Sequence, residues 1–165
     1  MTLSLPELRL NPALDPHAFA EQYARDRFVQ VSDILEPHLA DSLETLLKSL
    51  PWRLVYVDPK EGVVQLSQAE LQQMGQQGVA QRMAHVMELA TRNYGYCYNA
   101  YQMNEAADEG RDVAHPIHRL TEFLNGEEFR SFVSTVIGEA GLTRTDAQAT
   151  LYTRGSFLTR HIDDG

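Results

Sequence analysis

The sequence is poor in cysteine and lysine, and it lacks any long apolar run. Its single cysteine, Cys97, cannot form an internal disulfide, which indicates a reducing compartment and predicts a cytoplasmic protein. No uninterrupted apolar stretch approaches the roughly 20 residues that cross a bilayer. Residues 1–11 also lack the charged, apolar and small-residue layout of a signal peptide. The sequence therefore predicts neither a membrane span nor export.

Positive charge is scarce as well. Lys48 and Lys60 are the only lysines, the arginines are scattered among acids, and the formal net charge is −9. Such a chain repels phosphates, so we expect no nucleic-acid partner. Polypeptides and small molecules are the favoured partners.

The length and composition indicate one globular domain. The 165 residues are 43% hydrophobic and 22% charged, which is enough apolar material for a core. No internal repeat or low-complexity linker interrupts the chain. We therefore expect residues 1–165 to form a single domain.

Periodicity and cap signals place the expected elements. Helical spacing predicts helices at residues 16–27, 37–49, 67–93, 117–125 and 128–137. Alternating or β-prone residues predict strands at residues 28–31, 52–57, 63–66, 96–103, 145–153 and 156–162. Ser67 and Glu70 match a capping box, Gly75 and Gly78 are expected to break the third helix, and residues 104–112 are expected to form a mobile loop. Helices come early and strands late, as in an α+β fold.

The chemistry that the sequence suggests lies at its end. His161 and Asp163 are two residues apart, so on a strand both side chains point to the same face. An imidazole and a carboxylate that converge in this way supply two of the three ligands of a facial triad on non-haem Fe(II). The pair is therefore a candidate metal site.

The residues around this pair strengthen the assignment. In residues 152–163, Tyr152, a turn at Gly155 and two apolar residues precede His161 and Asp163. The segment resembles the region of the first iron ligands in prolyl 4-hydroxylase-like oxygenases, which depend on Fe(II) and 2-oxoglutarate. Residues 129–138 and 50–52 resemble the region before the core in the branch that contains the ribosomal prolyl hydroxylases.

The resemblance implies a fold, a reaction and roles for three residues. The expected fold is α+β, with N-terminal helices packed on the opening strands of a double-stranded β-helix, or jelly roll. His161 and Asp163 would bind Fe(II), and the hydroxyl of Tyr152 would contact the co-substrate 2-oxoglutarate. The expected reaction uses O2 to hydroxylate a prolyl or other protein side chain, with ascorbate as a further cofactor.

The resemblance also implies two groups that no position of this chain matches. The family has a distal histidine as its third ligand and an arginine or lysine that pairs with the far carboxylate of 2-oxoglutarate. We therefore expect residues 1–165 to be the N-terminal portion of an oxygenase catalytic domain, with an incomplete jelly roll and no activity of its own.

Several alternatives stay open. The chain can be a non-catalytic α+β binding or interaction module, in which iron is held weakly or not at all. His115 and His118 have a spacing that suits zinc, although Pro116 lies between them and no second ligand pair is evident. The stripe of Tyr94, Tyr96, Tyr98 and Tyr101 can line a substrate groove or serve strand packing, and Cys97 is typical of a buried filler.

Overall fold

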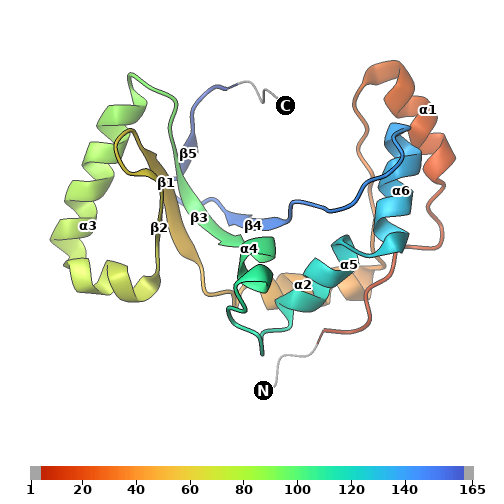
Figure 1. The fold of residues 1–165 in the computed structure, drawn as a ribbon, viewed down its shortest axis with the longest axis horizontal. Helices are drawn as coiled ribbons and strands as arrows, with labels where there is room; N and C mark the ends of the chain where they lie inside the picture. The colour runs from red at the N-terminus through yellow and green to blue at the C-terminus, as the bar shows by residue number, and fades with distance from the viewer. Residues whose placement is uncertain (1–4, 162–165) are drawn as a thin grey trace. The chain divides into compact units, whose positions relative to one another are not determined.

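A computed structural model describes residues 5–161, which fold as two compact units. The helical unit combines the residues up to Ser49 with Gln102–Ala147, and the sheet unit combines Leu50–Tyr101 with the residues from Gln148 onward (Figure 1). The described residues form six helices and one open antiparallel sheet, which confirms the α+β prediction. That residues 1–165 form one domain stays a prediction, because two compact units can belong to one domain or to two.

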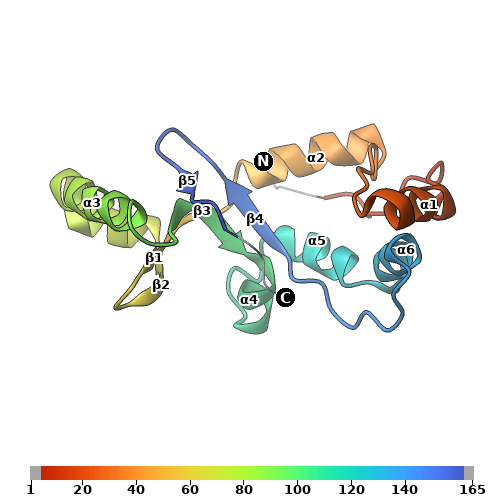
Figure 2. The ribbon, with the colours of Figure 1, turned by 90° about the horizontal axis from the view of Figure 1, so that it is seen from above.

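The helical unit is built from short amphipathic helices. They are α1 (Pro16–Asp26), α2 (Pro37–Leu47), α4 (Met103–Asp108), α5 (Ile117–Leu124) and α6 (Glu127–Ile137). Helix α1 begins where the sequence predicts, because the Asp15 carboxylate accepts a hydrogen bond from the backbone N–H of His17 at 3.0 Å. Helices α1 and α6 lie side by side (Figures 1 and 2), and the ring of Phe19 meets the ring of Phe132 edge-on, with centroids 6.3 Å apart.

The sheet unit is centred on β3. Its strands are β1 (Arg53–Asp58), β2 (Gly62–Leu66), β3 (Tyr96–Gln102), β4 (Gln148–Leu151) and β5 (Phe157–Leu158). The strand order is β2-β1-β3-β4, and the short β5 also pairs with β3. Tyr56 lies opposite Cys97 and Val55 lies opposite Tyr98, so successive residues of β3 face opposite sides of the sheet.

Helix α3 (Gln68–Ala90) covers one of these faces (Figures 1 and 2). Tyr56, Val86 and Cys97 form the buried core between α3 and the sheet. The predicted capping box of Ser67 is confirmed, and the predicted break occurs at Gly75, whose φ is +67°. The expected break at Gly78 is wrong, because Gly78 keeps helical geometry. No helix of residues 5–161 is both long and apolar enough to cross a membrane.

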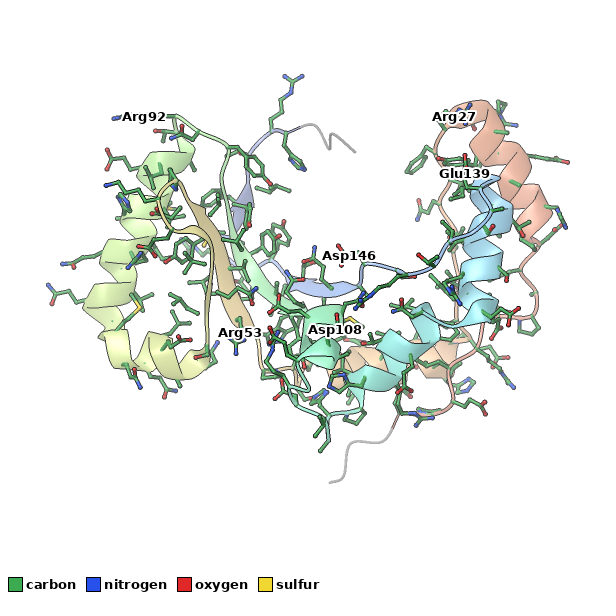
Figure 3. The ribbon with its side chains drawn as sticks, viewed as in Figure 1. Arg27, Arg53, Arg92, Asp108, Glu139 and Asp146 are labelled. Atoms are coloured by element: carbon green, nitrogen blue, oxygen red, sulfur yellow. The ribbon has the colours of Figure 1, made fainter. Side chains whose placement is uncertain are left out.

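The prediction of a mobile loop at residues 104–112 is wrong, because the first part of this segment forms α4. Ala106 is fully buried, which anchors the helix. Arg111 reduces the repulsion between acidic side chains of this segment, because it pairs with Glu105 at 2.7 Å and with Glu109 at 2.6 Å. The carboxylate of Asp108 (Figure 3) pairs with Arg144 at 2.6 Å. Opposite charges from outside the helix therefore stabilise an acidic sequence in helical form.

Three strand predictions also need correction. Residues 28–31 form no strand, and Phe28 is 68% exposed. The strand expected at residues 145–153 is confined to β4, because Thr145 instead donates through its backbone N–H to Asn125 Oδ1 at 2.9 Å and through its hydroxyl to Leu124 O at 2.7 Å. The strand expected at residues 156–162 is confined to the two residues of β5 among those described.

Asp58 closes the turn between β1 and β2. Its Oδ1 accepts hydrogen bonds from the backbone N–H groups of Lys60 at 2.8 Å and Glu61 at 3.1 Å. These two bonds, followed by the nearby positive charges of His85 and Arg82, lower the pKa of Asp58 below its ordinary value of 3.8. The carboxylate therefore stabilises the hairpin in its ionised form.

Substituting Asp58 by Asn is expected to produce a pH-dependent loss of stability. Because the pKa is lower in the folded state, the stabilisation by Asp58 is fully present above 3.8 and is lost as the pH falls through the folded-state pKa. Urea unfolding should show the wild type more stable than D58N near neutral pH, with the difference shrinking below pH 3.8. D41N, at an exposed position of α2, is the control. A difference between wild type and D58N that is constant down to low pH would contradict this account.

Candidate functional site

Two of the three predicted site residues lie in the described part of the sheet unit. Tyr152 directly follows β4, and His161 lies three residues after the end of β5. Both side chains are exposed. Asp163 lies outside the described residues, so its place beside His161 stays a prediction.

A continuous row of rings joins Tyr152 to His161. It consists of Tyr152, Tyr98, Tyr96, Tyr94 and His161, and we call it the tyrosine row. Tyr152 stacks on Tyr98 with ring centroids 5.0 Å apart and an interplanar angle of 25°. Tyr98 meets Tyr96 at 5.3 Å, and Tyr96 meets Tyr94 at 5.8 Å. The row ends where Tyr94 meets the imidazole of His161 at 5.7 Å. Arg92, labelled in Figure 3, marks the end of α3 from which the chain enters the row.

The alternation of β3 explains which tyrosines join the row. Tyr94, Tyr96 and Tyr98 are two residues apart, so they share the face opposite to Cys97 and the α3 core. Tyr101 has the other parity and is only 1% exposed. The predicted stripe of four tyrosines therefore divides, and Tyr101 belongs to the core.

A tight turn connects β4 to β5 and separates the two predicted site residues. The backbone N–H of Ser156 donates to Thr153 O at 2.9 Å, and the backbone N–H of Thr153 donates to Ser156 Oγ at 3.0 Å. Gly155 has a φ of +95°, a conformation that side chains with a Cβ rarely adopt. Gly155 thus allows the chain to pair with β3 again, as β5, after it leaves β4 at Tyr152.

Thr159 fixes the backbone that carries His161. Its N–H donates to Gly95 O at 2.9 Å, and its hydroxyl oxygen accepts from the Gly95 N–H at 3.0 Å. Its carbonyl oxygen lies 3.0 Å from Nδ1 of His161. A carbonyl only accepts, so the proton of this bond is on Nδ1, and the neutral imidazole has its lone pair on Nε2. This is the arrangement that metal-binding histidines commonly have.

Tyr96 and Tyr98 are the half-buried members of the row. Burial raises the pKa of Tyr96 and of Tyr98, and the neighbouring tyrosines raise both further. Both phenols therefore keep their protons at neutral pH. On the other face, burial raises the pKa of the Cys97 thiol, which lies 3.6 Å from Met83 Sδ. Cys97 is buried, as the sequence predicts.

No protein-family model, curated protein or solved structure matches this chain. Residues 5–161 contain no group of three or more His, Cys, Asp and Glu side chains arranged to hold a metal ion. The assignment of His161, Asp163 and Tyr152 accordingly stays a prediction. The rings of Tyr94, Tyr96 and Tyr98 lie between Tyr152 and His161 in the row.

The second pair of histidines has structural partners in the helical unit. Nδ1 of His115 accepts a hydrogen bond from the backbone N–H of Ile117 at 3.2 Å, and its Nε2 lies 3.3 Å from Ser49 Oγ. Nε2 of His118 lies 2.9 Å from Arg111 O. These contacts favour a structural role for the pair over the zinc site.

A cavity of about 290 Å³ opens within the sheet unit, on the face of the sheet that bears Cys97. Its lining is mainly apolar, with a few polar groups from β3 and the β4–β5 turn. The lining residues are Leu54, Met83, Met87, Cys97, Asn99, Thr153, Arg154, Gly155, Ser156 and Phe157. This size and mixture are typical of a small-molecule site.

Sequence reasoning missed the groups that support the predicted residues. Thr159 and Gly95 hold His161, and Tyr94 and Tyr98 contact the two predicted site residues. The signal that was available is parity, because Tyr94, Tyr96 and Tyr98 alternate along the strand while Tyr101 does not. Nothing in the sequence pairs Tyr98 with Tyr152, which lies 54 residues further along the chain, or Tyr94 with His161, which lies 67 residues further along.

Proposed function

We propose that this chain belongs to an Fe(II)- and 2-oxoglutarate-dependent oxygenase that hydroxylates a prolyl or other protein side chain. In this proposal the open sheet is the first part of a double-stranded β-helix, and His161 and Asp163 are two of the iron ligands. No position of this chain matches the family's third ligand or the cation that pairs with the far carboxylate of 2-oxoglutarate.

One observation carries the proposal. Tyr152 and His161, which the sequence pattern assigns to one site, lie at the two ends of a single row of rings on one face of the sheet. The sequence places them nine residues apart, and the turn at Gly155 with the pairing of β5 to β3 brings both to that face. A co-substrate beside His161 would therefore face the same side of the sheet as Tyr152, with the rings of Tyr94, Tyr96 and Tyr98 between the two residues.

The chemistry of the donors fits iron. A neutral imidazole with its lone pair on Nε2, together with a carboxylate two residues later, supplies the nitrogen and oxygen ligands that non-haem Fe(II) takes. When bound, iron and 2-oxoglutarate would allow O2 to act as the oxidant: one oxygen atom would enter the succinate that forms from 2-oxoglutarate with release of CO2, and the other would hydroxylate an unactivated C–H bond.

The residues of this chain would bind the co-substrate, orient the imidazole of His161 and keep water from the site. Thr159 O holds the Nδ1 proton of His161 and so sets the orientation of the ring. The phenol of Tyr152 donates a hydrogen bond to 2-oxoglutarate, an interaction with a charged acceptor. Tyr96 and Tyr98 form an apolar wall that strengthens the electrostatic contacts next to it.

The second candidate is a non-catalytic binding module, and the cavity on the Cys97 face favours it. Arg154 and Asn99 would provide polar contacts in an otherwise apolar space of about 290 Å³. This module would bind a small organic molecule without turnover. Iron-dependent consumption of 2-oxoglutarate separates the two candidates.

The test is succinate formation from 2-oxoglutarate by the longest natural form of the protein, with and without Fe(II). Substituting Tyr152 by Phe is expected to raise the KM for 2-oxoglutarate about tenfold, because one hydrogen bond to a charged group contributes about 1.5 kcal/mol. The value of kcat should change less, since the ring and its stacking remain. Y23F, on α1 in the helical unit, is the matched control.

One outcome would count against the oxygenase proposal as a whole, and another only against the role of Tyr152. If no succinate forms with Fe(II) present, the binding module becomes the better account. If succinate forms and Y152F has the KM of the wild type and of Y23F, the oxygenase assignment stands and the role of Tyr152 does not.

A further inference from the structure

The stacking of Tyr98 on Tyr152 joins a well-held ring to an exposed one. Tyr98 lies on β3, which pairs with β1, β4 and β5, and it sits opposite the buried Val55. Tyr152 is 51% exposed and follows the end of β4. The two rings are stacked at 5.0 Å and 25°. Contact with Tyr98 therefore limits the positions that the Tyr152 ring can take.

The opposite end of the row differs, because Tyr94 precedes β3 and is itself 53% exposed. The side chain of His161 is exposed, and its ring meets Tyr94 at 5.7 Å with an interplanar angle of 54°. Tyr94 is in turn held by Tyr96 at 5.8 Å and 61°. Thr159 fixes the backbone and one ring nitrogen of His161, while Tyr94 restricts the tilt of the imidazole from the side.

Tyr96 makes the two ends interdependent, because it contacts both Tyr94 and Tyr98. The row is thus one run of ring-to-ring contacts. Of its three inner members, Tyr96 and Tyr98 lie on β3 and Tyr94 lies two residues before its start. Tyr96 and Tyr98 lie on a paired strand, so their rings lose little freedom when they hold a neighbour, whereas Tyr94 is held through its contact with Tyr96.

We propose that Tyr98 and Tyr94 are positioning residues of this site, with Tyr98 holding the ring of Tyr152 and Tyr94 holding the imidazole of His161. This inference rests on the proposed function for its effect on 2-oxoglutarate and metal binding, while the ring positions themselves do not depend on it. The contacts are between rings, so the aromatic ring of each positioning residue is needed and its hydroxyl is not.

The first measurement needs neither iron nor turnover. The metal-free full-length protein is labelled with ¹³C in tyrosine rings and histidine imidazoles, and the signals of Tyr152 and His161 are assigned by substitution. In Y98L the Tyr152 ring signals should move toward those of an unstructured tyrosine, whereas in Y98F they should stay near wild type. The His161 signals should respond in the same way to Y94L and Y94F. Unchanged Tyr152 signals in Y98L would overturn the inference.

The second measurement is binding without oxygen, with Mn(II) in place of Fe(II). Calorimetric titration of 2-oxoglutarate should give a Kd about three- to tenfold higher for Y98L and within about twofold of wild type for Y98F. Y94L should weaken Mn(II) binding by a similar factor, and Y94F should restore it. If Y98L fails to fold, Tyr98→Val, which retains a strand-forming residue, is measured in its place.

The Y152A and H161A variants separate this inference from the proposed function. If Y152A weakens 2-oxoglutarate binding and Y98L does not, the positioning role is wrong and the site assignment holds. If Y152A and H161A bind 2-oxoglutarate and Mn(II) like wild type, the proposed function fails, and the ring signals still decide whether Tyr98 and Tyr94 hold their neighbours.

Discussion

Substituting His161 by Ala is expected to lower Fe(II)-dependent succinate formation by at least about a hundredfold. Residues that merely orient a metal ligand contribute 10- to 100-fold to metal affinity or activity, so loss of His161, a ligand in the proposed site, should cost at least the upper value. The imidazole presents Nε2 as its acceptor because Nδ1 is bonded to Thr159 O at 3.0 Å. The measurement is initial rate at saturating 2-oxoglutarate in the longest natural form of the protein.

A matched histidine controls for general effects of the substitution. His17 is exposed on α1 in the helical unit, and H17A should keep wild-type turnover. Added Fe(II) at high concentration should restore part of the H161A activity only if the remaining ligands still bind. Equal rates for wild type and H161A would remove His161 from the site, and equal losses in H161A and H17A would point to instability in both.

Substituting Tyr56 by Ala is expected to destabilise the sheet unit by about 3–5 kcal/mol. Tyr56 is fully buried on β1, where it packs with Val86 and Cys97 between α3 and the sheet. Removing the ring leaves a cavity where α3 packs on the sheet. Urea unfolding followed by the fluorescence of Trp52, the single tryptophan, reports on this unit because Trp52 directly precedes β1.

The hydroxyl of Tyr56 provides a sharper version of the same test. Among the described residues it makes no hydrogen bond of ordinary geometry, and burial raises its pKa although the nearby Arg82 acts in the opposite direction. Y56F should therefore cost less than about 1 kcal/mol or increase the stability, because a buried polar group without a partner is removed. V63A, at an exposed position of β2, should also cost less than about 1 kcal/mol. A Y56F variant as unstable as Y56A would mean that the hydroxyl, rather than the ring, holds the core.

The features that the sequence predicted correctly depend on neighbouring residues. Asp15 caps α1 by accepting a hydrogen bond from His17, two residues later. Ser67 and Glu70 cap α3 within its first turn. Such contacts are fully specified by a short window of sequence. The kink at Gly75 is of the same kind, because a positive φ is a local requirement that glycine meets.

The features that the sequence missed depend on distant partners. Residues 28–31 have β-prone side chains, yet a strand needs a neighbour and none is paired with them. Residues 104–112 become helical in part because Arg144, far along the chain, neutralises Asp108. In the candidate site, the contact of Tyr98 with Tyr152 joins residues more than 50 positions apart, which no window of sequence reveals.

The turn at residues 153–156 makes the number of residues between Tyr152 and His161 as important as their identity. Side chains alternate between the two faces of a strand, so inserting or deleting one residue in this turn would send the following side chains to the opposite face. His161 would then turn away from the other members of the tyrosine row, although every residue of the proposed site was still present. Over evolutionary time this segment should accept many substitutions on its exposed side, such as at Arg154, while changes in its length are selected against.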